Sequence, residues 1–317
     1  MLADVLTPDL FASALRMATP LALAAIGGTI CERSGVVNIA LEGMMLAGSF
    51  SAVVATMYSG SPWVGVLAAI VTGMLFSLPH AIASVTLKTD QVVSGTAINI
   101  LALGVTGFMI QIIYGHPGST DPVTKLRPFL DIQGPSGGVA GEVWRWVDTI
   151  FLSHTPIVYI AIALAILLQW WMYRTTWGLR LRALGEHPRA ADTVGISVIK
   201  GRYMAVLFSG AMAGLAGANL SLEGVGVFSE NMTNGRGFIA LAANIFGRWT
   251  PGGSYLASLL FGFADALQIK LQLMRDVILI PSQFFLMLPY ILTVVVLAGV
   301  VGRAVAPAAI GKPYEKG

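Results

Sequence analysis

The chain alternates long apolar runs with short polar junctions. An α-helix needs about 20 apolar residues to cross a ~30 Å hydrocarbon layer. Runs of about this length, one of them shorter, fall at residues 12–30, 36–58, 63–87, 91–114, 155–173, 203–222, 236–248, 252–272 and 282–301. They are continuously apolar, unlike the residue-by-residue alternation of a transmembrane β-barrel. The pattern predicts an all-α polytopic membrane protein with about eight to ten transmembrane helices.

Two places in this pattern indicate helices that break inside the membrane. The run at 236–248 is too short to cross a bilayer, so we expect a broken or re-entrant segment there. The stretch GGTICERSGVVNIALEG, residues 27–43, is too polar and too rich in glycine for a continuous span. Such breaks are tolerated at membrane depth only where protein or a watery cavity satisfies the backbone polar groups.

A short internal echo accompanies these breaks. Residues 38–43 read NIALEG after the first run, and residues 219–224 read NLSLEG at the end of the sixth. The alternation of the runs places the two hexapeptides on opposite faces of the membrane, as in the inverted-topology repeats of transporters. The echo favours an inverted repeat, although one matched hexapeptide also arises by chance.

Composition agrees with a membrane protein and narrows its chemistry. Of the 317 residues, 56% are hydrophobic and 11% are charged, and the mean hydropathy is +0.76. The net charge of +3 gives no reason to expect a nucleic-acid partner. Cys31 is the single cysteine, which excludes an intrachain disulfide and a cysteine-rich metal site. Gly210–Gly214 (GAMAG) is a small-residue face of the kind that lets membrane helices approach closely. Residues 1–20 have no basic segment or clear cleavage site, so we expect them to be retained.

Lysine and arginine predict the orientation, because they are in excess in cytoplasmic loops. The loop 174–202 is expected in the cytoplasm because it holds Arg174, Arg180, Arg182, Arg189, Lys200 and Arg202. If four crossings lie between them, the tail 303–317 is on the same side, and on that basis we expect a cytoplasmic C-terminus. The N-terminus and the loop 115–154, whose charges balance, come out extracytoplasmic. Lys270 and Arg275 come out on that side too, against the rule.

Polar side chains at membrane depth are costly and mark candidate functional sites. Glu32, Arg33, Asn38 and Glu42 surround the predicted break at 27–43. Glu32 and Arg33 fit a tight interfacial turn equally well, where they reach water or each other. Asn38 and Glu42 lie further into the span and are the stronger candidates for a polar pathway.

Other polar residues lie inside later runs. Asn99 is mid-span and Asn244 is in the short run, and each either hydrogen-bonds a polar solute or pins two helices together. Asp265 either pairs with Lys270 or Arg248 or faces an aqueous cavity.

The remaining chemistry is sparse. Glu223 lies at a span end, where a carboxylate at the water interface is typical, and His80 follows Pro79 as a structural residue at a kink. No two histidines have metal-ligand spacing, so we expect no metal site. The chain has neither a Walker ATP-binding loop nor a recognisable catalytic arrangement, so we expect no enzyme and no bound cofactor.

The basic loop contains one segment of special interest. PRAADTVGI, residues 188–196, predicts a short helix that begins at Pro188 and stops at Gly195. Ala190 and Ala191 leave a smooth surface on it. The segment suits a peg for a cytoplasmic partner and, equally, a connector that its positive flanks hold inside the cell.

Four stretches together resemble permease subunits of bacterial ABC importers. They are ERSGVVNIALEGMMLAG, TDQVVSGTAINILALG, GLRLRALGEHPRAADTVGI and GFIALAANIFGRWTPGGSYLASLLFGFADALQ. The nearest branch is the nucleoside and simple-sugar permeases, which are related to the ribose and branched-chain amino-acid permeases. The resemblance covers roughly residues 12–305 and is weak in 115–152 and in the tail.

The resemblance implies a type II-like importer fold over a single transmembrane domain, residues 1–317, in the bacterial plasma (inner) membrane. It implies a second permease subunit, often a different chain, and a separate cytoplasmic ATPase, often with two fused cassettes, that binds ATP and Mg. A solute-binding lipoprotein or periplasmic protein would deliver the solute. The loop Gly178–Ile196 matches the region that docks on the ATPase, although the family's E-A-A…G motif is only partly present.

The resemblance and the polar residues together give the candidate sites. The expected ATPase-coupling residues are Arg182, Gly185, Glu186, Pro188, Arg189, Ala190, Ala191, Asp192, Gly195 and Ile196. The expected lining of the solute pathway is Asn38, Glu42, Asn99, Asn219, Glu223 and Asn244. Amide side chains both donate and accept hydrogen bonds, which suits a nucleoside and suits ribose as well.

Two other classes remain as rivals. A secondary transporter driven by an ion gradient would use Asp265, Glu42 or Glu223 as a proton or cation site. An intramembrane enzyme is disfavoured because no nucleophile–base or metal pattern is present.

Overall fold

A computed structural model describes residues 6–129, 137–274, 284, 285, 287, 291, 294 and 305–315. The predicted run at 282–301 therefore lies largely outside the described residues. Arg275, which entered the prediction of orientation, and Arg303 of the tail lie outside them altogether. Within the described ranges the chain is helical, with one isolated bridge between Ser119 and Ser229. The prediction of an all-α protein is confirmed.

The helices follow the apolar runs closely. They are α2 (Pro8–Arg33), α3 (Leu41–Ser59), α4 (Pro62–Ala81), α5 (Gln91–Tyr114), α6 (Gly138–Val147), α7 (Pro156–Arg174), α8 (Thr176–Glu186), α9 (Pro188–Thr193), α10 (Val198–Ala218), α11 (Arg236–Phe246) and α12 (Pro251–Leu273). Short π-helical segments extend α4, α6 and α10, at Ile82–Thr86, Asp148–Leu152 and Asn219–Val225. In the described part of the chain, 7 helices are long and apolar enough to cross a membrane, and α11 is a shorter apolar helix.

Local sequence explains where these helices begin and end. Asp90 accepts hydrogen bonds from the first N–H groups of α5, and Thr250 does the same for α12. Helices α2, α4, α7, α9 and α12 have proline in their first turn, where its missing N–H costs nothing. Gly60 and Gly115 end α3 and α5 in the left-handed conformation that glycine adopts without strain.

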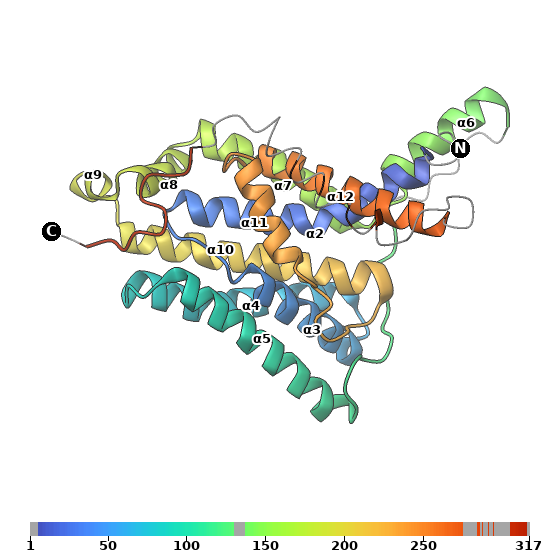
Figure 1. Ribbon diagram of the computed structural model, residues 1–317, viewed down its shortest axis with the longest axis horizontal. Helices are drawn as coiled ribbons and strands as arrows, with labels where there is room; N and C mark the ends of the chain where they lie inside the picture. The colour runs from blue at the N-terminus through green and yellow to red at the C-terminus, as the bar shows by residue number, and fades with distance from the viewer. Residues whose placement is uncertain are drawn as a thin grey trace.

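The helices form a central layer and a peripheral layer. Most of the apolar length of α2, α3 and α10 is buried, against about a third or less in α4, α5, α7 and α12. Figure 1 shows α2 and α10 side by side through the middle of the bundle, with α7 and α12 on one flank and α4 and α5 on the other. The outer helices therefore keep wide apolar faces for lipid or for another subunit.

Small residues allow the central helices to lie close together. A Cβ atom on Gly214 of α10 would collide with the carbonyl oxygen of Ala69 in α4. One on Gly210 would run into Ser77 and the backbone of Gly73. The small-residue face predicted at Gly210–Gly214 is thus the contact surface between α10 and α4.

Two helices begin inside the bundle instead of at its end (Figure 1). After α2 ends at Arg33, residues 34–40 turn back, and Leu41 at the start of α3 lies against Gly28 of α2. Gly28 is five residues from the end of α2, so α3 starts about 8 Å inside the bundle at 1.5 Å per residue. The predicted span at 36–58 was therefore wrong at its start, because residues 36–40 are not helical.

The second such helix is α11, which begins beside Glu42 in the first turn of α3. Its last turn lies at the end of α2, where Arg33 binds the backbone of Arg248 and Trp249. The expected re-entrant segment at 236–248 is this half-length helix. Residues 34–40 lead into the bundle from the end where Arg202 of α10 lies. Residues 226–235 lead into it from the opposite end. An inverted repeat predicts two such segments of opposite direction.

The two long loops lie at opposite ends of the bundle (Figure 1). One end carries α8, α9 and the segment 305–315. The other end carries the start of α2, α6 and residues 115–129, whose backbone pairs with residues 222–230. This separation agrees with the opposite positions that charge predicted for the loops 174–202 and 115–154.

Candidate functional site

Glu32, in the last turn of α2, holds α11 and the turn after it. Its side chain is only 2% exposed, and Oε2 accepts hydrogen bonds from Asn244 Nδ2 (2.7 Å) and Trp249 Nε1 (2.5 Å). The other end of the Asn244 amide, Oδ1, lies 2.8 Å from Thr29 Oγ1. Asn244 is fully buried and pins α11 to α2 through both ends of its amide.

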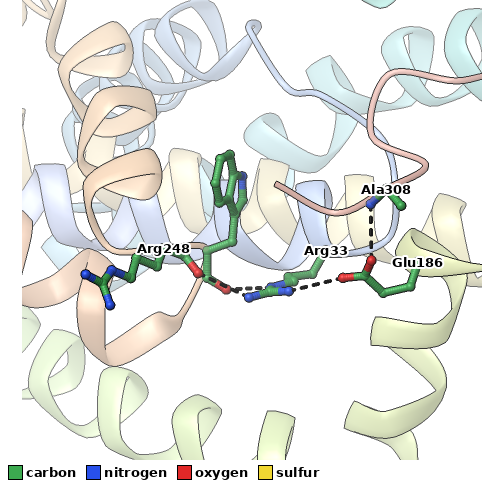
Figure 2. A network of polar contacts seen from close by, with 5 residues as sticks. Arg33, Glu186, Arg248 and Ala308 are labelled. Carbon is green, nitrogen blue, oxygen red and sulfur yellow. Dashed lines mark hydrogen bonds and ion pairs between the residues drawn. The ribbon is translucent and has the colours of Figure 1, made fainter. Parts of the chain in front are cut away.

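Arg33, the next residue, binds the same turn from the outside. Its Nε donates to the Trp249 carbonyl (2.7 Å) and its Nη2 to the Arg248 carbonyl (3.1 Å). Its Nη1 lies 3.6 Å from Glu186 Oε1 at the end of α8. Figure 2 shows this contact as a dashed line. The alternative in which Glu32 and Arg33 simply reach water or each other is wrong, because both are engaged with residues 244–249.

Glu42 joins the two helices that begin inside the bundle. Oε1 accepts from the Gly235 N–H (2.7 Å) and Oε2 from the Gly237 N–H (2.6 Å), at the start of α11. A carboxylate is well suited to this position, since a helix N-terminus has free N–H groups and a partial positive charge. Glycine is required at 237, because a Cβ atom there would collide with the backbone of Glu42.

Asn38 and Asn99 stabilise the break between α2 and α3. Asn99 of α5 accepts from the Gly43 N–H (2.8 Å) and donates to the Ile39 carbonyl (3.0 Å), so it bridges both sides of the break. Asn38 donates to Ser209 Oγ of α10 (2.9 Å). These amides replace the hydrogen bonds that the interrupted helix lacks.

The six residues predicted to line the pathway therefore form two groups. Asn38, Glu42, Asn99 and Asn244 surround the two breaks, and each is 9% exposed or less. Asn219 and Glu223 bond to each other at the far end of α10. In this conformation all six have partners within the protein, and their contact with solute stays a prediction.

Other residues near the breaks were missed or misassigned by sequence reasoning. Trp249 and Thr29 complete the network of Glu32. The sequence signal for Trp249 was the polar turn GRWTPGG, and the signal for Thr29 was its place in the polar stretch 27–43. Arg236 begins α11 and donates to the Met232 carbonyl. No ion pair joins Asp265 to Lys270 or Arg248, all of which lie in described helices or turns.

The predicted coupling loop forms two short helices with distinct faces. As predicted, a helix begins at Pro188 and the chain turns at Gly195, whose φ is +83°. Arg189, Ala190 and Gly195 are exposed, as is Val194 (73%), a residue that sequence reasoning did not select.

Other members of the predicted coupling set face inward. Ala191 packs against Leu184 and Val198, with Ile196 at the edge of this cluster. The guanidinium of Arg182 lies 4.8 Å from the centre of the Tyr173 ring. Gly185 packs directly on the carbonyl of Arg33. These residues hold the loop in place, while Pro188 and Asp192 are partly exposed on α9.

Residues 305–315 close this end of the bundle. The Ala309 N–H donates to the Gly185 carbonyl (2.8 Å), and the Gly311 N–H donates to the Gly35 carbonyl (3.1 Å). Arg202 of α10 is 1% exposed and donates to the carbonyls of Ser34 (3.1 Å) and Lys312 (3.0 Å). The segment therefore fastens the first break to the coupling loop.

A bundle of apolar helices with two breaks that enter from opposite ends defines a multi-pass membrane transport protein. The family model described as the branched-chain amino acid transport system / permease component matches residues 10–297. The chain belongs to this family and is a permease subunit of the ABC transporter class, as the sequence resemblance implied.

Two of the curated relatives match almost the whole chain. It is 45% identical over 312 residues to the guanosine ABC transporter permease protein NupQ of Bacillus subtilis, which covers 95% of this chain and 94% of the relative. It is 40% identical over 314 residues to the nucleoside ABC transporter permease protein NupC of Lactococcus lactis, covering 96% of each. A second guanosine permease protein of B. subtilis, NupP, is 29% identical over 262 residues, covering 78% of this chain and 70% of the relative.

Proposed function

We propose that this permease imports a nucleoside across the bacterial plasma membrane, driven by ATP hydrolysis in a separate subunit. The observation that carries the proposal is the similarity, over 95% or more of the chain, to permeases that are named for guanosine and for nucleosides. A nucleoside is neutral and presents donors and acceptors on base and ribose, which the amides and carboxylate around the two breaks match.

Orientation follows from charge. The end that carries α8, α9 and residues 305–315 faces the cytoplasm in this proposal, because the basic residues of 174–202 are concentrated there. The exposed surface of Arg189, Ala190, Val194 and Gly195 is then available to the ATPase, which holds ATP and Mg. The loop 115–154 faces the solute-binding lipoprotein or periplasmic protein.

A second, different permease subunit completes the pathway. B. subtilis has two guanosine permease proteins, NupQ and NupP, and this chain is similar to both. The wide exposed faces of the peripheral helices supply area for such a partner. The pathway forms between the two subunits, next to the breaks.

Transport then proceeds by alternating access. The binding protein releases the nucleoside into an outward-facing cavity, and ATP binding moves the coupling loop. The cavity opens inward as the half-length helices shift, and the membrane site needs only weak affinity because ATP and the binding protein supply the difference between states.

Uptake by proteoliposomes tests the proposal. The permease pair, the ATPase and the binding protein are reconstituted, and entry of labelled guanosine is measured with ATP or a non-hydrolysable analogue on the ATPase side. We expect uptake that requires hydrolysable ATP and persists when an ionophore collapses the proton gradient. Uptake that follows the ion gradient without ATP would instead support the secondary transporter.

A further inference from the structure

The end of α8 is a place where the coupling loop contacts both α2 and the segment 305–315. Gly185 packs on the Arg33 carbonyl, where no larger residue would fit. The two oxygens of Glu186 bind different elements: Oε1 lies 3.6 Å from Arg33 Nη1, and Oε2 accepts from the Ala308 N–H at 3.2 Å. Figure 2 shows Glu186 between these two partners.

Arg33 continues this connection to the turn between α11 and α12. The guanidinium is planar and its N–H groups have fixed directions, so its contacts with Glu186 and with the turn cannot change independently. Its Nε and Nη2 bind the carbonyls of Trp249 and Arg248. Those two residues have φ of 51° and 53°, a left-handed conformation that is uncommon outside glycine.

Beyond the turn, α11 is short and held at both ends. Asn244 and Trp249 bind Glu32 near its last turn, and the N–H groups of Gly235 and Gly237 bind Glu42 at its first. Among the described residues α11 packs mainly on α2, α12 and α3. A helix of this length can shift as one body. Displacing the turn at 248–249 therefore displaces the start of α11 and the carboxylate of Glu42.

We propose that Glu186 and Arg33 form the relay that carries movement of the coupling loop to the half-length helix α11, with Arg33 as the positioning residue. The inference rests on the proposed function. The side chains of Arg33 and Glu186 are 14% and 43% exposed. An ion pair that is open to water on one side contributes little to stability, so its importance is geometric.

Two variants of the complete complex test the relay. Arg33→Lys keeps the charge but loses the planar fork, and Glu186→Gln keeps an acceptor for the Ala308 N–H but loses the charge. In each we expect the ATPase to copurify as in the wild type and to hydrolyse ATP. The number of nucleosides imported per ATP should fall about tenfold, which is typical of lost coupling between sites.

A control and a second readout make the test specific. Glu142→Ala removes an Arg–Glu pair of similar spacing (3.8 Å) on α6, far from the coupling loop, and should leave the ratio unchanged. Ile245→Cys places a thiol on α11 at a residue that is 39% exposed. ATP should change its rate of maleimide labelling in the wild-type background and not in the Glu186→Gln background.

The outcomes separate the relay from the proposed function. Maleimide labelling does not require a nucleoside. If ATP changes the labelling rate but no nucleoside is taken up, the proposed substrate is wrong and the relay is still supported. The relay is overturned if both variants import as many nucleosides per ATP as the wild type. It is also overturned if they lose the ATPase on purification, because Glu186 and Arg33 would then serve docking.

Discussion

Replacing the carboxylate of Glu42 is the sharpest test of how the first turns of α3 and α11, both inside the bundle, are held together. Its two oxygens accept N–H bonds of 2.7 and 2.6 Å from Gly235 and Gly237. Hydrogen bonds to a charged group contribute about 1.5–3 kcal/mol each. Glu42→Ala removes both and leaves a buried N–H at Gly237, so it should cost about 3–5 kcal/mol. Glu42→Gln keeps one oxygen and should cost about half as much.

Thermal unfolding of the purified permease in detergent measures this effect. At a few degrees per kcal/mol, Glu42→Ala should lower the midpoint by about 10 °C, and Glu42→Gln by about 5 °C. A matched control is Glu230→Ala, which removes a carboxylate bond to the Gly118 N–H (3.0 Å) on the exposed surface. Water replaces that bond, so the control should shift the midpoint by about 2 °C or less.

The reasoning is refuted if Glu42→Ala unfolds at the same temperature as Glu230→Ala. The start of α11 would then owe its position to packing alone. A midpoint for Glu42→Gln at the wild-type value would show that the negative charge contributes nothing at the helix N-terminus.

Three further outcomes are expected. Burial lowers the pKa of His154 below its ordinary 6.5, so the folded state binds fewer protons than the unfolded state. Stability should fall as the pH drops through 6.5, and His154→Gln should flatten that dependence in thermal unfolding. Gly214→Leu should separate α10 from α4, because even a Cβ atom meets the Ala69 carbonyl, and the yield of monodisperse protein on size-exclusion chromatography should collapse. Arg189→Glu combined with Asp192→Arg should abolish copurification with the ATPase, and unchanged copurification and transport would remove α9 from the docking surface.

Apolar runs were enough to predict the membrane helices that the structure describes, apart from the exact start of α3. A run such as 91–114 has one physical solution in a membrane, a helix that satisfies its own backbone. The short run at 236–248 was equally informative, because its length excluded a full crossing. These properties are local, so the sequence contains them directly.

The break after α2 was harder to predict because its partners are distant in the chain. Val36, Val37 and Ile39 look like the start of a helix, yet the Val37 N–H binds Gln91 Oε1 (2.7 Å) and its carbonyl lies 2.9 Å from His80 Nε2. Those side chains come from α5 and α4. The structural role predicted for His80 agrees with this contact.

In the candidate site, too, the sequence predicted the polar residues but not their distant partners. Glu42, Asn99 and Asn244 stood out because polar residues are expensive in a membrane. Their partners, the start of α11, the edges of the break and Glu32, are brought near only by the fold. The sequence could not show that these groups satisfy one another in this conformation.

The segment 305–315 has a consequence for how the protein is made. It follows every membrane helix from α2 to α12 in the chain. Its contacts with Gly35, Gly185 and Arg202 nevertheless hold the end of the bundle that carries α8 and α9. A nascent polypeptide that stops after α12 lacks the hydrogen bond from the Ala309 N–H to the Gly185 carbonyl at the end of α8. If the ATPase docks on this loop as proposed, a chain that ends before residue 312 would recruit it poorly, which would favour whole permeases over truncated ones during assembly of the complex.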